Sequence, residues 1–172
     1  MNIALVAHDS RKKELIEWVT YNLPTLRKHK LYATGTTGKL IKQAYLDWWE
    51  ELENEHDITP MTENWEKHKE EAEKFVTCLH SGPLGGDQEI GSMIANGQVN
   101  VLIFFCDNLI QQGHQNDVSA LTRLASLYNI AFATNRTTAD MIITSPLLAE
   151  MELGHYVPVV PGAIESYKNR QL

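Results

Sequence analysis

The segment Ser81–Gly91, SGPLGGDQEIG, places one aspartate, Asp87, among four glycines. Glycine takes backbone conformations closed to other residues, and we expect Gly85 and Gly86 to let the chain approach a small ligand closely. A carboxylate held there is suited to three tasks: a general base, a metal ligand, or the N-cap of a helix predicted near Ile90. No carboxylate or histidine recurs nearby at a ligand-like spacing, which disfavours the metal site.

A second cluster, Thr34–Gly38 with the sequence TGTTG, combines three hydroxyls with two glycines between a predicted strand and a predicted helix. Threonine hydroxyls and the N–H groups of a helix N-terminus both donate hydrogen bonds to phosphate. Lys12 would add a positive charge. The spacing is not that of a Walker A loop, because Lys39 is followed by leucine. The cluster is therefore either an anion cradle or a capped turn.

A third group lies in the segment GHQND, residues 113–117. Asp117 stands at the start of a predicted helix, where a plain N-cap is one interpretation. His114 lies in a loop beside a glycine and has no evident role in a core. Its ring nitrogens are suited to polarising a carbonyl or protonating a leaving oxygen near neutral pH. A serine nucleophile is not indicated, because Ser81 lies in no nucleophile-elbow pattern.

Short, nearly continuous apolar runs are typical of strands buried on both faces of a parallel sheet. The predicted strands are Ile3–Ala7, Leu31–Ala33, Val101–Cys106, Ile130–Ala133 and Met141–Ile143. Between them, apolar residues recur at helical spacing. The predicted helices are Arg11–Tyr21, Ile90–Asn96 and Asp117–Tyr128. This alternation predicts an α/β fold with a doubly wound parallel sheet.

Ligands of such a sheet bind beyond the carboxyl ends of its strands. Four predicted strands end there in polar, hydrogen-bonding residues. These exits are His8-Asp9, Thr34–Gly38, Asp107 and Thr134–Thr138. A polar loop after any one strand is ordinary, but four such exits together indicate a site.

The 172-residue chain has a net charge of −7 and no cluster of Lys and Arg, which argues against nucleic-acid binding. Residues 47–74 alone contain eleven acidic residues and three lysines. Trp48, Trp49 and Trp65 punctuate this segment, and Thr59-Pro60 is typical of a helix start. We predict an inserted acidic helical hairpin over about residues 45–75, with its tryptophans anchored either on the core or on a neighbouring subunit.

Several classes of protein are disfavoured by composition. No apolar stretch approaches the roughly 20 residues of a membrane span. The N-terminal apolar run is interrupted by His8 and Asp9, which indicates a buried strand and not a signal peptide. Cys78 and Cys106 are isolated, so neither a zinc site nor a disulfide scaffold is indicated. We expect one domain over residues 1–172 in a reduced, cytoplasmic setting.

Taken in order, several segments resemble the methylglyoxal synthase family. They are IALVAHDSRKK (3–13), LYATGTTGKL (31–40), SGPLGGDQEIG (81–91), VLIFFCDNL (101–109), GHQNDVSALTRLA (113–125) and ATNRTTAD (133–140). The resemblance implies a lyase that converts dihydroxyacetone phosphate into methylglyoxal and inorganic phosphate, with no metal ion and no organic cofactor. It also implies a homohexamer of flavodoxin-like, three-layer α/β subunits, with phosphate as product and inhibitor.

By resemblance, the catalytic base falls on Asp87, the histidine acting at the substrate carbonyl and enediolate on His114, and a supporting carboxylate on Asp117. The implied substrate-binding residues are His8, Lys12, Thr34, Gly35, Thr36, Thr37, Ser81 and Gly82. Family members also have a C-terminal arginine that reaches a neighbouring subunit's site, and Arg170 is suitably placed in a divergent tail. Asn108 and Asn116 stand where the family commonly has proline.

One alternative has a different function on the same fold. Domains similar to methylglyoxal synthase also occur as non-catalytic regulatory modules that bind phosphorylated effectors. A module of that kind needs the phosphate cradle but not Asp87, His114 and Asp117. The presence of all three favours the enzyme.

Overall fold

The computed structural model describes residues 1–172 apart from 57–60, 111–112, 114 and 170–172, and apart from the side chains of 53–64. The described residues form a five-stranded parallel sheet in the order β3-β2-β1-β4-β5. Its strands are β1 (Asn2–Ala7), β2 (Lys30–Thr34), β3 (Val76–Leu79), β4 (Val101–Phe105) and β5 (Ala131–Ala133). The inner strands β1 and β4 are buried on both faces, which explains their continuous apolar runs.

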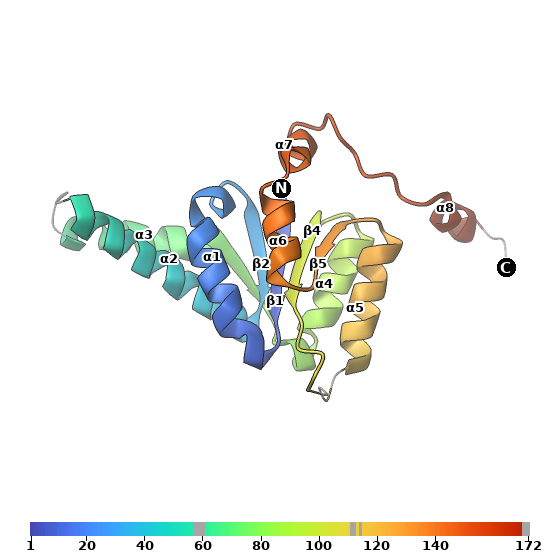
Figure 1. The fold of residues 1–172 in the computed structure, drawn as a ribbon, viewed down its shortest axis with the longest axis horizontal. Coiled ribbons are helices and arrows are strands. Elements are labelled where there is room, and N and C mark those ends of the chain that lie inside the picture. Colours follow the sequence, from blue (N-terminus) through green and yellow to red (C-terminus); the bar gives the residue numbers. More distant parts are fainter. Residues whose placement is uncertain (57–60, 111–112, 114, 170–172) are drawn as a thin grey trace.

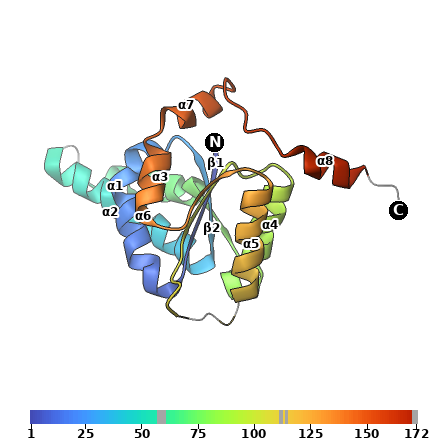
Figure 2. The same ribbon diagram turned by 45° about the vertical axis from the view of Figure 1, so that its right-hand side comes forward.

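Helices cover both faces of the sheet, as Figures 1 and 2 show. In chain order the helical elements are η1 (Asp9–Arg11), α1 (Lys12–Leu26), α2 (Gly35–His56), α3 (Met61–Phe75), η2 (Gly82–Leu84), α4 (Gly86–Ala95), α5 (Gln115–Leu127), α6 (Arg136–Ile143), α7 (Pro146–Glu152) and α8 (Gly162–Lys168). One core joins α1, α2 and α6 to one face of the sheet, and a second core joins α4 and α5 to the other. Alternate residues of β1 point into each core, Ile3 and Leu5 into the first and Ala4 and Val6 into the second.

The predicted three-layer, doubly wound parallel architecture is confirmed. The strand order reverses between β1 and β4, so the crevice for a ligand opens between these two strands. Flavodoxin itself has the order 2-1-3-4-5, with the reversal between its first and third strands. Among the described residues, no helix combines the length and apolarity that crossing a membrane requires.

The predicted strand at Met141–Ile143 is wrong, because these residues form the last turn of α6. Asn135 begins that helix by accepting a hydrogen bond from the backbone N–H of Thr138. Met141 is 68% exposed and Ile143 is 9% exposed, so only one side of the run is buried. Three apolar residues are too few to distinguish a strand from a helix end by pattern.

The sequence reading also missed β3, which pairs with β2 at an edge of the sheet. Its residues Thr77 and Cys78 are exposed, and only Val76 is fully buried. An edge strand with one solvated side lacks the continuous apolar run that marked the inner strands. The other predicted strands and helices are confirmed, with their ends displaced by a few residues and with α4 beginning at Gly86 instead of near Ile90.

The predicted helical hairpin is formed by α2 and α3, which extend together from one edge of the sheet (Figure 1). The guanidinium of Arg27 lies 5.8 Å from the ring centre of Trp48 and 5.3 Å from that of Trp49. His68 of α3 stacks on Trp49 with ring centres 4.5 Å apart. Both tryptophans pack against the first core, so this chain itself supplies their anchor. Thr59 and Pro60 lie outside the described residues.

Trp18 joins α1 to the sheet and to α6. Its side chain is fully buried, its ring centre lies 6.2 Å from that of Phe105, and its indole N–H donates to Asp140 at 2.8 Å. We expect Trp18→Ala to lower the free energy of unfolding by about 3–5 kcal/mol, because it leaves a large cavity and an unmatched carboxylate. Urea denaturation measures this loss.

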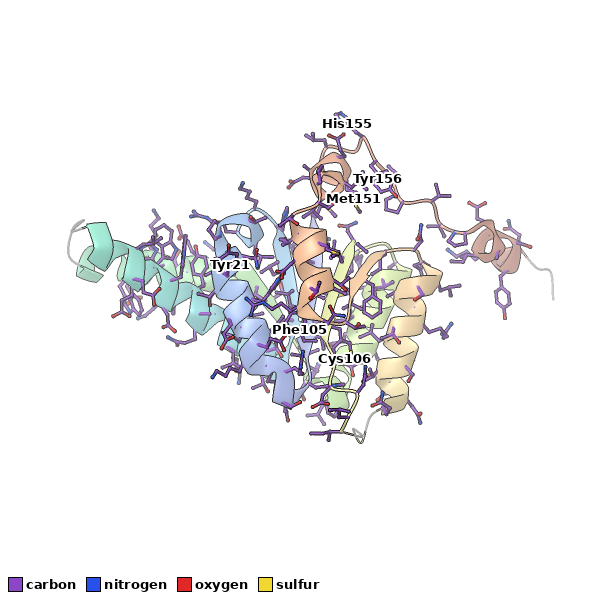
Figure 3. The ribbon with its side chains drawn as sticks, viewed as in Figure 1. Tyr21, Phe105, Cys106, Met151, His155 and Tyr156 are labelled. Carbon is purple, nitrogen blue, oxygen red and sulfur yellow. The ribbon has the colours of Figure 1, made fainter. Side chains whose placement is uncertain are left out.

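Tyr21→Ala is the matched control, because Tyr21 lies on the same helix and is 80% exposed (Figure 3). We expect it to change the free energy of unfolding by less than about 0.5 kcal/mol. Equal effects of the two substitutions would contradict the packing role of Trp18.

Candidate active site

A cavity of about 580 Å³ opens at the carboxyl ends of the strands. Nine of the residues predicted from the sequence line it. They are His8, Lys12, Thr34, Thr36, Thr37, Ser81, Gly82, Asp87 and Asp117. The structure therefore brings together side chains that the chain order separates by more than 100 residues.

The two helical layers contribute different chemistry to this cavity. Lys12 and Thr37 come from α1 and α2, which cover one face of the sheet, and they supply a cation and a hydroxyl. Asp87 and Asp117 come from α4 and α5, which cover the other face, and they supply carboxylates. The cavity thus has an anion-binding part on one side of the sheet edge and an acid/base part on the other. A ligand in the cavity would lie across both parts.

The anion-binding part lies at the first turn of α2, a 22-residue helix that begins at Gly35. Its N-terminus carries N–H groups that have no acceptor within the helix, and it is the positive end of the helix dipole. Thr37 is 1% exposed, and its hydroxyl has no hydrogen-bond partner among the described residues. A buried hydroxyl in that state needs a partner, and a phosphate oxygen supplies one.

The cation of this part is Lys12, the first residue of α1. Its ammonium lies 2.5 Å from a carboxylate oxygen of Asp9, and its side chain is 20% exposed. Asp9 also lines the cavity. The pair holds Lys12 at the cavity rim, where an incoming anion meets a charge that is already desolvated in part.

Gly35 does not line the cavity, although the resemblance placed it among the substrate-binding residues. Its backbone N–H donates instead to the carbonyl of His80 at 3.1 Å. Its Cα faces Ser81, where an added Cβ would lie 3.1 Å from the backbone nitrogen. Gly35 thus joins the start of α2 to the segment that carries Asp87.

Asp87 is 2% exposed and lies in the first turn of α4. The N-cap of this helix is Gly85, in the left-handed region at φ 109°, so the capping role considered for Asp87 does not apply. A Cβ on Gly82 would lie 3.0 Å and 3.2 Å from the two carboxylate oxygens. The bare backbone of Gly82 therefore lies against the carboxylate, and both line the cavity.

Gly86 has a role different from the one expected from the sequence. A Cβ there would lie 2.1 Å from the carbonyl oxygen of His80, a distance that no side chain tolerates. The glycine permits α4 to begin directly against the end of β3, and not against a ligand. This close contact determines where Asp87, the next residue, lies.

His8 follows β1 and is 4% exposed. Its Nδ1 accepts a hydrogen bond from the backbone N–H of Asp107 at 2.8 Å, and its ring meets Phe104 edge-on at 5.0 Å. An Nδ1 that accepts places the proton of the neutral ring on Nε2. His8 is therefore held as a donor through Nε2.

Asp107 ties the exits of β1 and β4 together, and the sequence reading noted it only as a strand exit. Its carboxylate accepts from the Ser10 hydroxyl at 2.5 Å and from the Leu109 N–H at 2.9 Å. The Ser10 hydrogen bond is the main reason that the pKa of Asp107 lies below its ordinary value. Its position directly after a buried strand was the available signal.

Six other residues that line the cavity were not among the predicted site residues, namely Val6, Ala7, Asp9, Pro83, Phe104 and Gly113. Asp9 adjoins His8 at a polar strand exit, which is a usable signal. Phe104 and Pro83 carry no such signal, because an apolar strand residue and a turn proline look the same whether or not they border a cavity.

The remaining predicted residues have different outcomes. Asp117 lies in the first turn of α5, and together with Asp87 it also borders a neighbouring groove between α4 and α5. His114 and Arg170 lie outside the described residues. The β5 exit, Thr134–Thr138, is absent from the described cavity wall, and Asn135 within it caps α6.

Cys106 lies near the same strand ends, beside Phe105 in Figure 3. Burial is the main cause that raises the pKa of its thiol to about 11, with smaller effects from the charge of Arg11, which lowers the pKa, and from that of Asp87, which raises it. A thiol with this pKa is protonated at neutral pH and is a poor nucleophile.

Comparison with known proteins gives one consistent result. Residues 59–134 match the family model described as MGS-like domain. Methylglyoxal synthase of Oleidesulfovibrio alaskensis is 43% identical over 159 residues, covering 92% of this chain and 88% of that protein. Methylglyoxal synthase of Maridesulfovibrio salexigens is 48% identical over 146 residues, covering 84% and 83%.

Solved structures agree with the sequence relatives. The crystal structure of methylglyoxal synthase from Elizabethkingia anophelis matches with a TM-score of 0.67 and 36% identity, covering 99% of this chain and 91% of that one. Both the sequence and the fold are thus shared over nearly the whole length, and the chain belongs to the methylglyoxal synthase family.

Proposed function

We propose that this protein is a methylglyoxal synthase, a lyase that converts dihydroxyacetone phosphate into methylglyoxal and inorganic phosphate. The observation that carries the proposal is the joint presence of two buried groups on the wall of one cavity, the Asp87 carboxylate and the Thr37 hydroxyl, which has no hydrogen-bond partner among the described residues. Membership of the family supplies the reaction, and the cavity supplies groups that fit its two halves.

The phosphate group of the substrate binds at the first turn of α2. Thr34, Thr36 and Thr37 donate from their hydroxyls or backbone, and Lys12 supplies the charge. These groups both hold the ester and stabilise the phosphate that leaves.

Asp87 acts as the base at the other end of the cavity. It removes a proton from C3, next to the carbonyl, and the electron pair moves onto the carbonyl oxygen to give an enediolate. His114, by family resemblance, donates to that oxygen, and His8 is held with its ring proton on Nε2 at the same cavity. Stabilising the oxyanion is the larger part of the task, since carbon acids ionise reluctantly.

The C3 hydroxyl of the enediolate gives its proton to the C2 oxygen, and C3 becomes the aldehyde carbon. The π electron pair of C2–C3 moves between C1 and C2, the C1–O bond breaks, and its electron pair leaves with phosphate. This requires the C–O bond to lie roughly perpendicular to the enediolate plane. The remaining enol takes up a proton at C1 while its C2 hydroxyl releases one, and it becomes methylglyoxal. Atoms and charge balance without any redox partner, and Asp117 supports the charge distribution beside Asp87.

The wider setting follows from the same resemblance. We propose a single domain that assembles as a homohexamer in the cytoplasm, with no metal or organic cofactor and with phosphate as product and inhibitor.

The direct test incubates the purified protein with dihydroxyacetone phosphate and follows methylglyoxal and free phosphate together. We expect both products at equal rates. Binding of phosphate without any turnover would overturn the lyase and favour a regulatory module.

Asp87→Asn tests the base. The amide keeps the shape but accepts no proton, so we expect kcat to fall by about 10²–10⁴-fold, the usual contribution of a general base. Binding of inorganic phosphate, measured by calorimetry, should change little because the cradle belongs to other helices. Asp47→Asn, an exposed site on α2, is the control. Near-normal turnover in Asp87→Asn would exclude this residue as the base.

Thr37→Val tests the cradle. The substitution keeps the shape of the side chain and removes a hydroxyl that has no partner among the described residues, so the protein should lose no stability. We expect phosphate binding to weaken by about 1.5–3 kcal/mol, the value of a hydrogen bond to a charged group. Unchanged phosphate affinity would remove Thr37 from the proposed cradle.

A further inference from the structure

The carboxylate of Glu89 forms two hydrogen bonds with one residue, His80. Its Oε2 accepts from the backbone N–H of His80 at 2.9 Å, and its Oε1 accepts from the ring Nδ1 at 2.7 Å. Glu89 lies on α4, two residues after Asp87, whereas His80 follows the end of β3. The two hydrogen bonds from His80 hold the pKa of Glu89 below its ordinary value, so the carboxylate is the form that binds.

The backbone of His80 is also the junction between the two halves of the cavity. Its carbonyl accepts from the N–H of Gly35, the first residue of α2 and the neighbour of the threonine hydroxyls. The same carbonyl oxygen occupies the space that a Cβ on Gly86 would need, so α4 begins against it. Residue 80 thus touches the start of the phosphate-binding helix and the start of the helix that carries Asp87.

The spacing of these two helix starts matters for the proposed reaction. The substrate has only three carbons, with the phosphate on C1 and the reactive proton on C3. A base displaced by about 1 Å from its productive position can lose a factor of 10² in rate. The distance between the cradle and Asp87 therefore has to be held by something other than the substrate.

We propose that Glu89 is a positioning residue, whose carboxylate fixes residue 80 and thereby sets Asp87 at the correct distance from the phosphate cradle. This rests on the proposed function of the cavity. Glu89 does not line the described cavity and touches no substrate, so it acts only through His80 and α4.

A purely structural role would look different. The side chain of His80 is 72% exposed and that of Glu89 is 37% exposed, and exposed ion pairs of this kind contribute little to stability. The main effect of losing the pair should therefore fall on geometry within the site, and not on the folded fraction.

The test measures kcat, KM and thermal stability of Glu89→Ala, together with two binding constants. The affinity for inorganic phosphate depends on the phosphate cradle alone. The affinity for phosphoglycolohydroxamate, an analogue of the enediolate, depends on both the cradle and the acid/base part of the cavity. We expect kcat and the analogue affinity to fall by about 10- to 100-fold, with phosphate affinity and melting temperature nearly unchanged. Glu89→Gln keeps an acceptor for the His80 N–H and should recover most of the loss.

The matched control is Glu150→Ala, which removes another exposed Glu–His pair, Glu150 with His155 at 3.1 Å. Figure 3 shows His155 at the opposite end of the molecule from Cys106 and the strand ends. We expect normal kcat from this variant.

Two results would overturn the proposal. One is an unchanged kcat and analogue affinity in Glu89→Ala. The other is a loss that falls equally on phosphate binding and on melting temperature, which would make the role structural. Failure of the proposed lyase function can be told apart from failure of the positioning role, because the wild-type protein would then show no turnover. The ratio of analogue affinity to phosphate affinity would still test the positioning role of Glu89.

Discussion

The contact between the Gly86 backbone and the carbonyl of His80 is the constraint on which the site depends. A side chain at position 86 would occupy the space of that oxygen. Because the two backbones touch, β3 passes into α4 within a few residues and Asp87 is buried at the first helical turn. The same carbonyl also holds Gly35 at the start of α2. One peptide group therefore links the helix that carries the carboxylate to the helix that offers the threonines.

This arrangement explains how one cavity can hold a substrate phosphate and a basic carboxylate, two groups that repel each other. Phosphate and carboxylate are both anionic, so a substrate phosphate and a basic carboxylate must be kept apart. The doubly wound fold achieves this by taking Lys12, Thr36 and Thr37 from one helical layer and Asp87 and Asp117 from the other. His8 follows the central strand β1, and its tautomer is determined by the Asp107 N–H. The parallel strand direction brings all these exits to the same edge.

The errors of the sequence reading have physical causes. Val76–Leu79 is an edge strand with exposed Thr77 and Cys78, so no continuous apolar run revealed it. Met141–Ile143 is apolar on one side only, and three residues cannot establish a period. Gly86 was expected to serve the ligand, because a glycine in a sequence carries no information about which atom occupies the space of its missing Cβ.

The sequence by itself determined the layered α/β class, the inner strands, and the chemical groups of the cavity, because buried runs and polar strand exits are local patterns. SGPLGGDQEIG and TGTTG also identified the family. Tertiary structure alone decided that the Gly35 N–H binds His80 and does not line the cavity, that Glu89 hydrogen-bonds to His80, and that Trp49 contacts both Arg27 and His68. These contacts join residues far apart or on different elements, and no local pattern specifies which groups meet when helices pack on a sheet.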